Sequence, residues 1–412
     1  MNKRWKYIGS CYLMSLLVYL AFWGLATAAP AVLSDRETSE TVTSLRHETV
    51  QTLNFYRQAA GLTPFKEDFR LAKAAQGHGD YITRNYPQRI TLDIHREQLG
   101  HSGFIGRDIG ERGAYFGYFG TVGEALDPGG AFTVKQGVMG LWDSPYHRLL
   151  LVNPNFNDIG VGFGEKDGNH NILVLATGTE QAAKDERLVV YPYDGQKDAK
   201  LGWLVSEVPN PLRFWNKENI VTGYPITVSV HSSKVRELRL KQAILTDENG
   251  LNVACYQVDS SMETMESEKK HAFLIPREPL AWNKTYHVAA EGTLVYQDGS
   301  SAPWRKAWDF HTVSQLQVAT ITVEQSAFSD GRALELLRLA TTAGDLPDLT
   351  YELWQGDRWI QRWDGRSHKF QFYQLLFLPG EYTLKMNGWG QSTSMTLQIY
   401  ETQGMKKVAL GN

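Results

Sequence analysis

The segment that most constrains this chain lies between residues 142 and 163. It contains WDSPYHR at 142–148, NPN at 153–155 and IGVGF at 159–163, in one-letter code. The apolar residues of 159–163 predict a strand, which pairs as a hairpin with 172–177 across a turn at 167–169. A short helix over 134–141 is expected before it. His147 is therefore expected on a turn between a helix and a buried strand.

Two helices are predicted upstream, within residues 34–85. The first ends at Gly61 and Pro64, which stop a helix. In the second, Asp68 is a plausible N-cap residue, and apolar residues recur along one face together with His78. A histidine on such a face is by default a core histidine whose hydrogen bonds are satisfied inside the protein.

These segments together resemble the bacterial CAP superfamily, named after cysteine-rich secretory proteins, antigen 5 and pathogenesis-related proteins. The resemblance covers about residues 36–180 and implies an α-β-α sandwich. In that family two histidines and two glutamates line a central cavity, which holds a metal in some members. By resemblance His101, in its His-Ser context, matches the first histidine, Glu124 matches the glutamate after a glycine, and His147 matches the second histidine.

The sequence departs from the family pattern at two positions. Ala125 stands where asparagine is usual, and no glutamate precedes His147 in the helix, so Asp143 is the only acid near it. His101, Glu124 and His147 could bind a divalent cation such as zinc if they converge, or perform acid–base chemistry. The alternatives are a loop histidine bonded to backbone for His101 and a helix-capping role for His147. His78 is expected behind the cleft.

The N-terminus predicts export. Three cations precede an apolar run at 7–25, and Ala-Thr-Ala at 26–28 has the form of a signal peptidase site. Residues 1–28 are thus a signal peptide, or a membrane anchor if they are not cleaved. Cleavage leaves Cys255 as the one thiol and changes the formal net charge from −3 to −6. We expect an extracellular or cell-surface protein that does not bind nucleic acid.

The rest of the chain is rich in predicted strands. Residues 187–314 suggest a β-sandwich, and VYPYDGQ at 190–196, GYPIT at 223–227 and WDFHT at 308–312 resemble the immunoglobulin-like module that often follows bacterial CAP domains. Residues 315–408 form a second β-sandwich, in which 333–340 suits a helix or a strand equally well. The aromatic residues Trp354, Trp359, Trp363 and Trp389 are expected to fill its core or to cover the face of a hairpin, rather than to form a platform for cell-wall sugars.

The predicted fold is therefore α+β: a CAP α-β-α sandwich followed by two all-β immunoglobulin-like modules. The expected function is binding of a small lipidic or peptidic ligand, or of a cell-envelope polymer, by an exported protein through the CAP cleft. The alternative is a metal-dependent hydrolase of peptide or cell-wall material that acts through His101, Glu124 and His147. Binding is favoured because the fourth acid is missing and no nucleophile or HExxH motif is present; Ser102 and Ser144 are the serines near the histidines.

Overall fold

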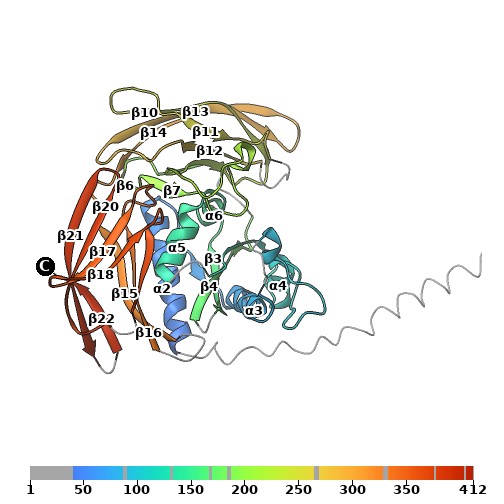
Figure 1. Cartoon of the computed structure of the whole chain (residues 1–412). Coiled ribbons are helices and arrows are strands. Elements are labelled where there is room, and N and C mark those ends of the chain that lie inside the picture. The colour runs from blue at the N-terminus through green and yellow to red at the C-terminus, as the bar shows by residue number, and fades with distance from the viewer. Residues whose placement is uncertain are drawn as a thin grey trace, which may run out of the picture.

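The computed structural model describes residues 40–86, 91–129, 133–166, 169–182, 187–263, 269–327, 333–374, 377–402 and 405–411 (Figure 1). The predicted signal segment at 1–28 and the turn residues 167–168 lie outside these ranges. Among the residues described, no helix combines the length and the apolar character needed to cross a membrane.

The first region contains five helices and one sheet within these residues. The helices are α2 (Glu40–Ala59), α3 (Phe69–Asn85), α4 (Ile109–Tyr115), α5 (Val134–Asp143) and α6 (Pro145–Leu151), with a 3-10 turn η2 (Leu92–His95). The sheet has the order β1-β3-β4-β2, built from β1 (Lys66–Glu67), β3 (Asp158–Lys166), β4 (Asn169–Thr179) and β2 (Thr121–Asp127). Strands β3 and β4 form the predicted antiparallel hairpin.

The sheet is covered on both faces, because alternate side chains of a strand point to opposite sides. On β4, Leu173 and Leu175 join the core formed with α2 and α5. Ile172, Val174 and Ala176 join the core formed with α3. The predicted α-β-α layering is therefore present.

Local sequence explains how α3 lies against this sheet. Asp68 is its N-cap, as predicted, and accepts hydrogen bonds from the backbone amides of Arg70 and Leu71. On β3, Gly160 and Gly162 face the helix so closely that a Cβ atom would lie 2.0 Å from Leu71 C and 2.2 Å from Ala75 C. The glycines of this strand thus allow direct approach of helix backbone to strand backbone.

The predicted histidine turn is wrong in one respect, because His147 lies inside a helix. Helix α5 runs to Asp143, and α6 begins at Pro145 after a single intervening residue. Proline is suited to the first position of a helix, where its missing N–H has no intrahelical partner to lose. Pro145 therefore begins a new helix with His147 in its first turn.

The second region, within 188–312, contains two four-stranded sheets and a small two-stranded one, β7-β8. Their orders are β10-β13-β14-β6 and β11-β12-β9-β5. The strands are β5 (Leu188–Tyr191), β6 (Gln196–Ala199), β7 (Gly202–Leu204), β8 (Val221–Gly223), β9 (Ile226–Val230), β10 (Val235–Asp247), β11 (Cys255–Val258), β12 (His271–Pro276), β13 (Thr285–Tyr296) and β14 (Ser301–Thr312), with a 3-10 turn η3 (Arg213–Trp215). The immunoglobulin-like assignment of this region stays a prediction.

The third region contains sheets β15-β16-β19 and β18-β17-β20-β21-β22. Its strands are β15 (Val318–Ala327), β16 (Ala333–Thr341), β17 (Thr350–Gln355), β18 (Arg358–Asp364), β19 (Lys369–Gln374), β20 (Gly380–Gly388), β21 (Gln391–Thr402) and β22 (Met405–Leu410). Residues 333–340 are therefore strand. Trp359 and Trp363 are 52% and 45% exposed, so they do not fill the core; they lie on the β17-β18 hairpin, which is the other position expected for them. They lie on β18 at the sheet edge, where side chains extend beyond the core.

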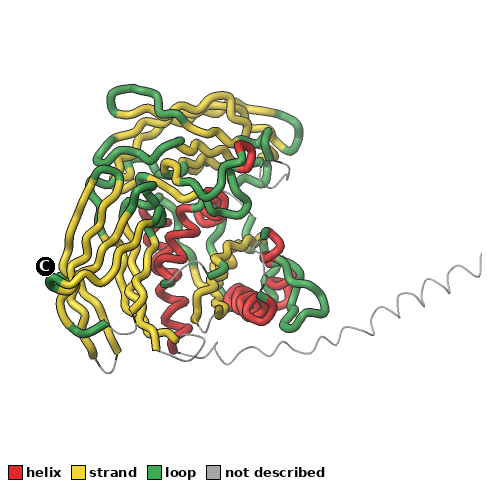
Figure 2. The backbone as a smooth tube through the Cα atoms, viewed as in Figure 1, coloured by secondary structure: helices red, strands yellow, loops and turns green. Residues whose placement is uncertain are grey.

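Continuous cores join the three regions. One apolar cluster contains Trp142 from α5 together with Tyr191, Tyr224 and Phe273 from the second region. Another links strands of the second region to those of the third. Figures 1 and 2 show both β regions packed around the helices α2, α5 and α6. Shared cores hold the three regions in a defined arrangement, unlike domains that meet at a small polar interface.

Candidate functional site

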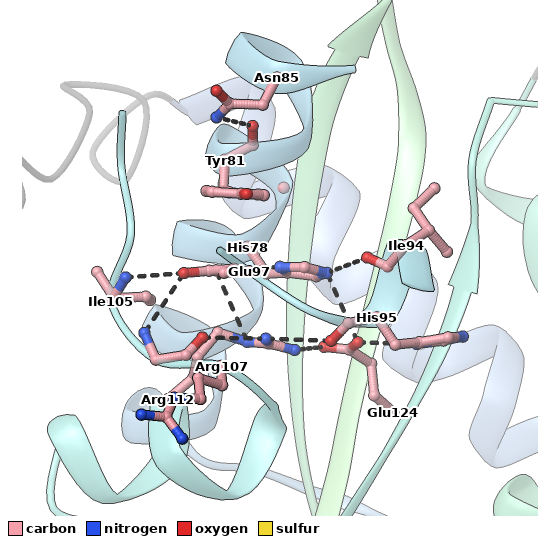
Figure 3. Close-up of polar contacts among 12 residues, drawn as sticks. His78, Tyr81, Asn85, Ile94, His95, Glu97, Ile105, Arg107, Arg112 and Glu124 are labelled. Atoms are coloured by element: carbon pink, nitrogen blue, oxygen red, sulfur yellow. Dashed lines mark hydrogen bonds and ion pairs between the residues drawn. The ribbon is translucent and has the colours of Figure 1, made fainter. Parts of the chain in front are cut away.

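A buried charge network surrounds Glu124 on β2 (Figure 3). The Arg112 guanidinium donates to Glu124 Oε2 at 2.6 Å, and His95 Nδ1 donates to Oε1 at 2.9 Å. The carboxylate side chain is 3% exposed. Burial raises the pKa of this group, but Arg112, His78 and His95 together hold it well below its ordinary value. Glu124 is therefore charged at neutral and mildly acidic pH, and both of its oxygens are occupied.

A second buried pair, His78 and Glu97, lies beside this network. His78 Nδ1 is 3.0 Å from Glu97 Oε1, and Nε2 is 3.0 Å from the carbonyl oxygen of Ile94. Both partners are acceptors when Glu97 is ionised, so the ring then needs a proton on each nitrogen to make both bonds. The other Glu97 oxygen accepts from the backbone amide of Ile105. The pair holds together the loop that contains His95.

His78 lies behind the cleft and does not line it. Its side chain is fully buried, and it acts as the satisfied core histidine that its helical position predicted. His95, Glu97 and Arg112 were missed. The sequence signal for this pair was that His95 and Glu97 lie two residues apart in the predicted loop. The His-Ser context instead favoured His101.

His101 does not join Glu124. Its exposed imidazole stacks on Tyr81, with ring centroids 6.3 Å apart, and its Nδ1 lies 3.3 Å from the Tyr81 hydroxyl. Tyr81 in turn stacks on His78, so it separates His101 from the buried network. The histidine beside Glu124 is His95, which η2 positions.

The donors do not fit a zinc site. The predicted trio of His101, Glu124 and His147 does not converge, and the described part of the chain holds no group of three His, Cys, Asp or Glu placed to share a metal ion. The surroundings of Glu124 also disfavour a zinc site, because a dication there would compete with the Arg112 guanidinium that already contacts the carboxylate.

His147 is held by an acid from the second region. Glu207 Oε1 accepts from His147 Nδ1 at 2.7 Å and from its backbone amide at 2.9 Å, while Oε2 accepts from the Tyr146 amide at 3.2 Å. Glu207 is fully buried and replaces a side-chain cap, since Ser144 caps no amide of α6. The acid expected near His147 is thus provided 60 residues later in the chain.

Asp143 and Arg148, on either side of this histidine, hold the interface with the second region. Lys200 Nζ is 2.6 Å from Asp143 Oδ2, and the Tyr224 hydroxyl donates to Oδ1 at 2.8 Å. Buried Arg148 donates to three backbone carbonyls, including that of Pro225, and packs over Tyr191 and Tyr224. Both residues are structural connectors.

His95 and His147 line one cleft of about 400 Å³. The second region contributes Trp203 and Glu207 to its wall, and the third contributes His368 and Lys369. His95 and His147 side chains are 28% and 15% exposed. Their Nε2 atoms make no hydrogen bond within the residues that the structure describes, so both are available to a ligand.

His368 adds a third imidazole of the same kind. Its Nδ1 contacts Asp345 Oδ1 at 2.8 Å, and its buried Nε2 has no hydrogen-bond partner among the described residues, lying 3.8 Å from Asp143 Oδ2. A carboxylate at Nδ1 fixes the orientation of each ring. The arrangement can hold and orient a polar ligand through imidazole nitrogens.

The two serines near the histidines are not placed for nucleophilic attack. Ser144 Oγ lies at the cleft but donates to the Gly140 carbonyl at 2.9 Å, and Ser102 is on the exposed loop of His101. Cys255 lies on β11 of the second region, and burial raises the pKa of its thiol to about 12. Neither serine has the activating hydrogen bond to a histidine that nucleophilic catalysis uses.

Comparison with known proteins agrees with the fold. Residues 50–177 match the family model described as CAP, the cysteine-rich secretory protein family. No curated protein matches the chain. A Bacillus anthracis extracellular protein containing an SCP domain is 19% identical, over 34% of this chain and 41% of that one, with a TM-score of 0.28. The alignment thus spans less than half of that protein.

Two further solved structures are similar. An outer surface protein from Borrelia burgdorferi is 19% identical over 33% of this chain and 92% of that chain, with a TM-score of 0.27. Fibronectin(III)-like modules of CbhA from Clostridium thermocellum are 10% identical over 51% of this chain and 92% of theirs, with a TM-score of 0.16. With the family match, the α-β-α layering and the histidine motif on α6, residues 50–177 are a CAP domain of the cysteine-rich secretory protein family.

Proposed function

We propose that this chain is an exported CAP-domain protein that binds a small peptidic ligand in the cleft between His95 and His147. The observation that carries the proposal is the pair of imidazoles on one cleft of about 400 Å³, each held at Nδ1 by a buried carboxylate and open at Nε2. Preorganised polar groups on a partly apolar wall are typical of ligand sites.

The composition of the wall favours a peptide over a lipid chain. Leu126, Leu141, Trp203 and Val208 supply apolar surface, and Lys369 supplies a cation. An imidazole nitrogen can donate or accept according to its tautomer, so it can pair with either half of an amide group. An acyl chain would cover the imidazoles without offering them hydrogen bonds, which is costly.

Binding is also better supported than hydrolysis. Both oxygens of Glu124 are occupied by Arg112 and His95, so this acid is not poised to activate water. Ser144 donates to a backbone carbonyl and not to His147. The metal-dependent hydrolase alternative therefore lacks an activated group at the cleft.

The proposed location is the cell surface or the extracellular space. It rests on the charged, then apolar N-terminal segment with its Ala-Thr-Ala sequence. Retention of residues 1–28 would anchor the protein to the membrane, and cleavage would release it.

The test uses the chain from residue 29 onwards and a library of di- and tripeptides, screened by saturation-transfer NMR and then by calorimetry. His147→Asn keeps an N–H near the Nδ1 position, for Glu207, but removes the Nε2 atom. We expect this substitution and His95→Asn to abolish peptide binding, while His47→Asn on the exposed side of α2 leaves it unchanged. Absence of peptide binding, or equal affinity in all variants, would refute the proposal.

A further inference from the structure

A second and larger groove lies on the other side of α5. It has a volume of about 780 Å³ and is lined by residues of α2, α5 and both β regions. Lys135, Met139 and Trp142 face this groove, whereas Gly140, Leu141 and Ser144 face the histidine cleft. Helix α5 therefore lies between two recesses, of which Asp143 at its end lines both, and the larger one contains none of the histidines discussed above.

Aromatic rings form one wall of this groove. Phe55 is 67% exposed and meets Tyr56 edge to face, with centroids 5.6 Å apart. Tyr56 stacks on Trp142 at 5.2 Å, and Tyr191 continues the series to Tyr193 at 6.2 Å. Trp142 and Tyr191 are buried behind, so Phe55, Tyr56 and Tyr193 present the accessible surface. An exposed phenylalanine beside half-buried tyrosines gives flat apolar faces next to polar groups.

Hydrogen-bonding groups border these rings. The Tyr56 and Tyr193 hydroxyls make no hydrogen bond to any residue that the structure describes. Burial, followed by the nearby acids, raises the pKa of both, so they remain protonated donors. The exposed carboxylates of Glu48 and Asp198 line the same groove and provide acceptors.

The charges of the lining disfavour a polyanionic ligand. Three carboxylates line the groove against two ammonium groups. Of these, Asp143 and Lys200 form an ion pair at 2.6 Å and neutralise each other. Glu48 and Asp198 then outnumber Lys135, which leaves a small negative excess and disfavours phosphate- or uronate-rich polymers.

We propose that this groove binds a neutral oligosaccharide. The apolar C–H faces of sugar rings stack on Phe55, Tyr56 and Tyr193, the tyrosine hydroxyls donate to sugar oxygens, and Glu48 and Asp198 accept from sugar hydroxyl groups. The volume of the groove, about twice that of the histidine cleft, accommodates several linked rings. This site is independent of the proposed peptide cleft, because its aromatic wall belongs to the opposite side of α5.

The experiment screens the chain from residue 29 onwards by saturation-transfer NMR. The probes are neutral tri- to hexasaccharides of glucose, N-acetylglucosamine, mannose and galactose, with oligogalacturonate as the anionic comparison. We expect at least one neutral oligosaccharide to bind and oligogalacturonate not to bind. Phe55→Ala and Tyr193→Ala should weaken binding about ten-fold, since each removes a stacking surface.

Three further variants test whether the sugar binds in this groove rather than elsewhere on the protein. Tyr193→Phe retains the ring but removes the hydroxyl, so it should weaken binding less than Tyr193→Ala. Phe119→Ala, which removes a 79% exposed ring outside the groove, should leave affinity unchanged. His147→Asn should also leave sugar binding unchanged. If no neutral oligosaccharide in the panel binds, or if binding survives loss of both Phe55 and Tyr193, the proposal is wrong.

Discussion

Substitution of Glu207 tests whether the second region helps to hold the histidine cleft together. Its buried carboxylate accepts three hydrogen bonds, from the amides of Tyr146 and His147 and from His147 Nδ1. Loss of a helix cap costs about 1 kcal/mol. Loss of a hydrogen bond that involves a charged group costs about 1.5–3 kcal/mol. We therefore expect Glu207→Ala to reduce the free energy of unfolding by about 3 kcal/mol, as the sum of these two terms.

The assay is thermal unfolding, followed by calorimetry under fixed conditions. At about 2 °C per kcal/mol for a chain of this size, the midpoint should fall by about 6 °C. Glu218→Ala is the matched control, because it removes an exposed acid of the same region. Nitrogen-15 NMR of the histidine side chains should show that the His147 ring changes its hydrogen-bonded state in Glu207→Ala alone. Equal midpoints for the two variants, with an unchanged His147 signal, would refute the reasoning.

Four other predictions follow from buried groups. Gly162→Ala should cost about 3 kcal/mol or more by calorimetry, because the new Cβ would lie 2.2 Å from Ala75 C and would displace α3. Arg112→Met should cost about 3–5 kcal/mol, since it leaves the buried Glu124 carboxylate without its guanidinium. The folded pKa of Glu124 lies below its ordinary value of 4.5, so the contribution of its charge to stability is complete above that pH. This contribution is lost as the pH falls toward the lowered pKa. Glu124→Gln should therefore reduce the fall in melting temperature at acidic pH, as measured by pH-dependent melting curves. The Cys255 thiol, with its pKa raised to about 12, should react with iodoacetamide at pH 8 much more slowly in the folded than in the unfolded protein, as followed by mass spectrometry.

Local patterns were sufficient for individual elements of the first region. Helix α3 follows from the Asp68 cap and an apolar face, and the β3-β4 hairpin follows from two apolar runs around a turn. These features depend on neighbours within a few residues, which a sequence displays directly. Residues 333–340 were ambiguous for the same reason, because pairing with β15 and β19 decides that they form a strand.

The choice between His95 and His101 shows where local information fails. The two histidines lie six residues apart between α3 and α4, His95 at the end of η2 and His101 in the loop after it, and a histidine at either position suits a site. The path of the backbone decides between them: Glu97 binds the Ile105 amide and His78, which keeps His95 beside Glu124 and leaves His101 outside Tyr81. A motif cannot supply that path, because it is set by contacts among side chains distant in the chain.

The sequence by itself indicated the early helices, the β3-β4 hairpin and the predominance of strands after residue 187, because hydrophobic periodicity, caps and turns are properties of short segments. Its resemblance to CAP proteins implied the α-β-α layering. Tertiary structure alone decided that His95 is the partner of Glu124, that Glu207 holds His147 from 60 residues away, and that all three regions build the cleft wall. The physical reason is that burial of apolar surface between the regions is largely non-directional, whereas the hydrogen bonds that orient each imidazole form only after those regions have packed together.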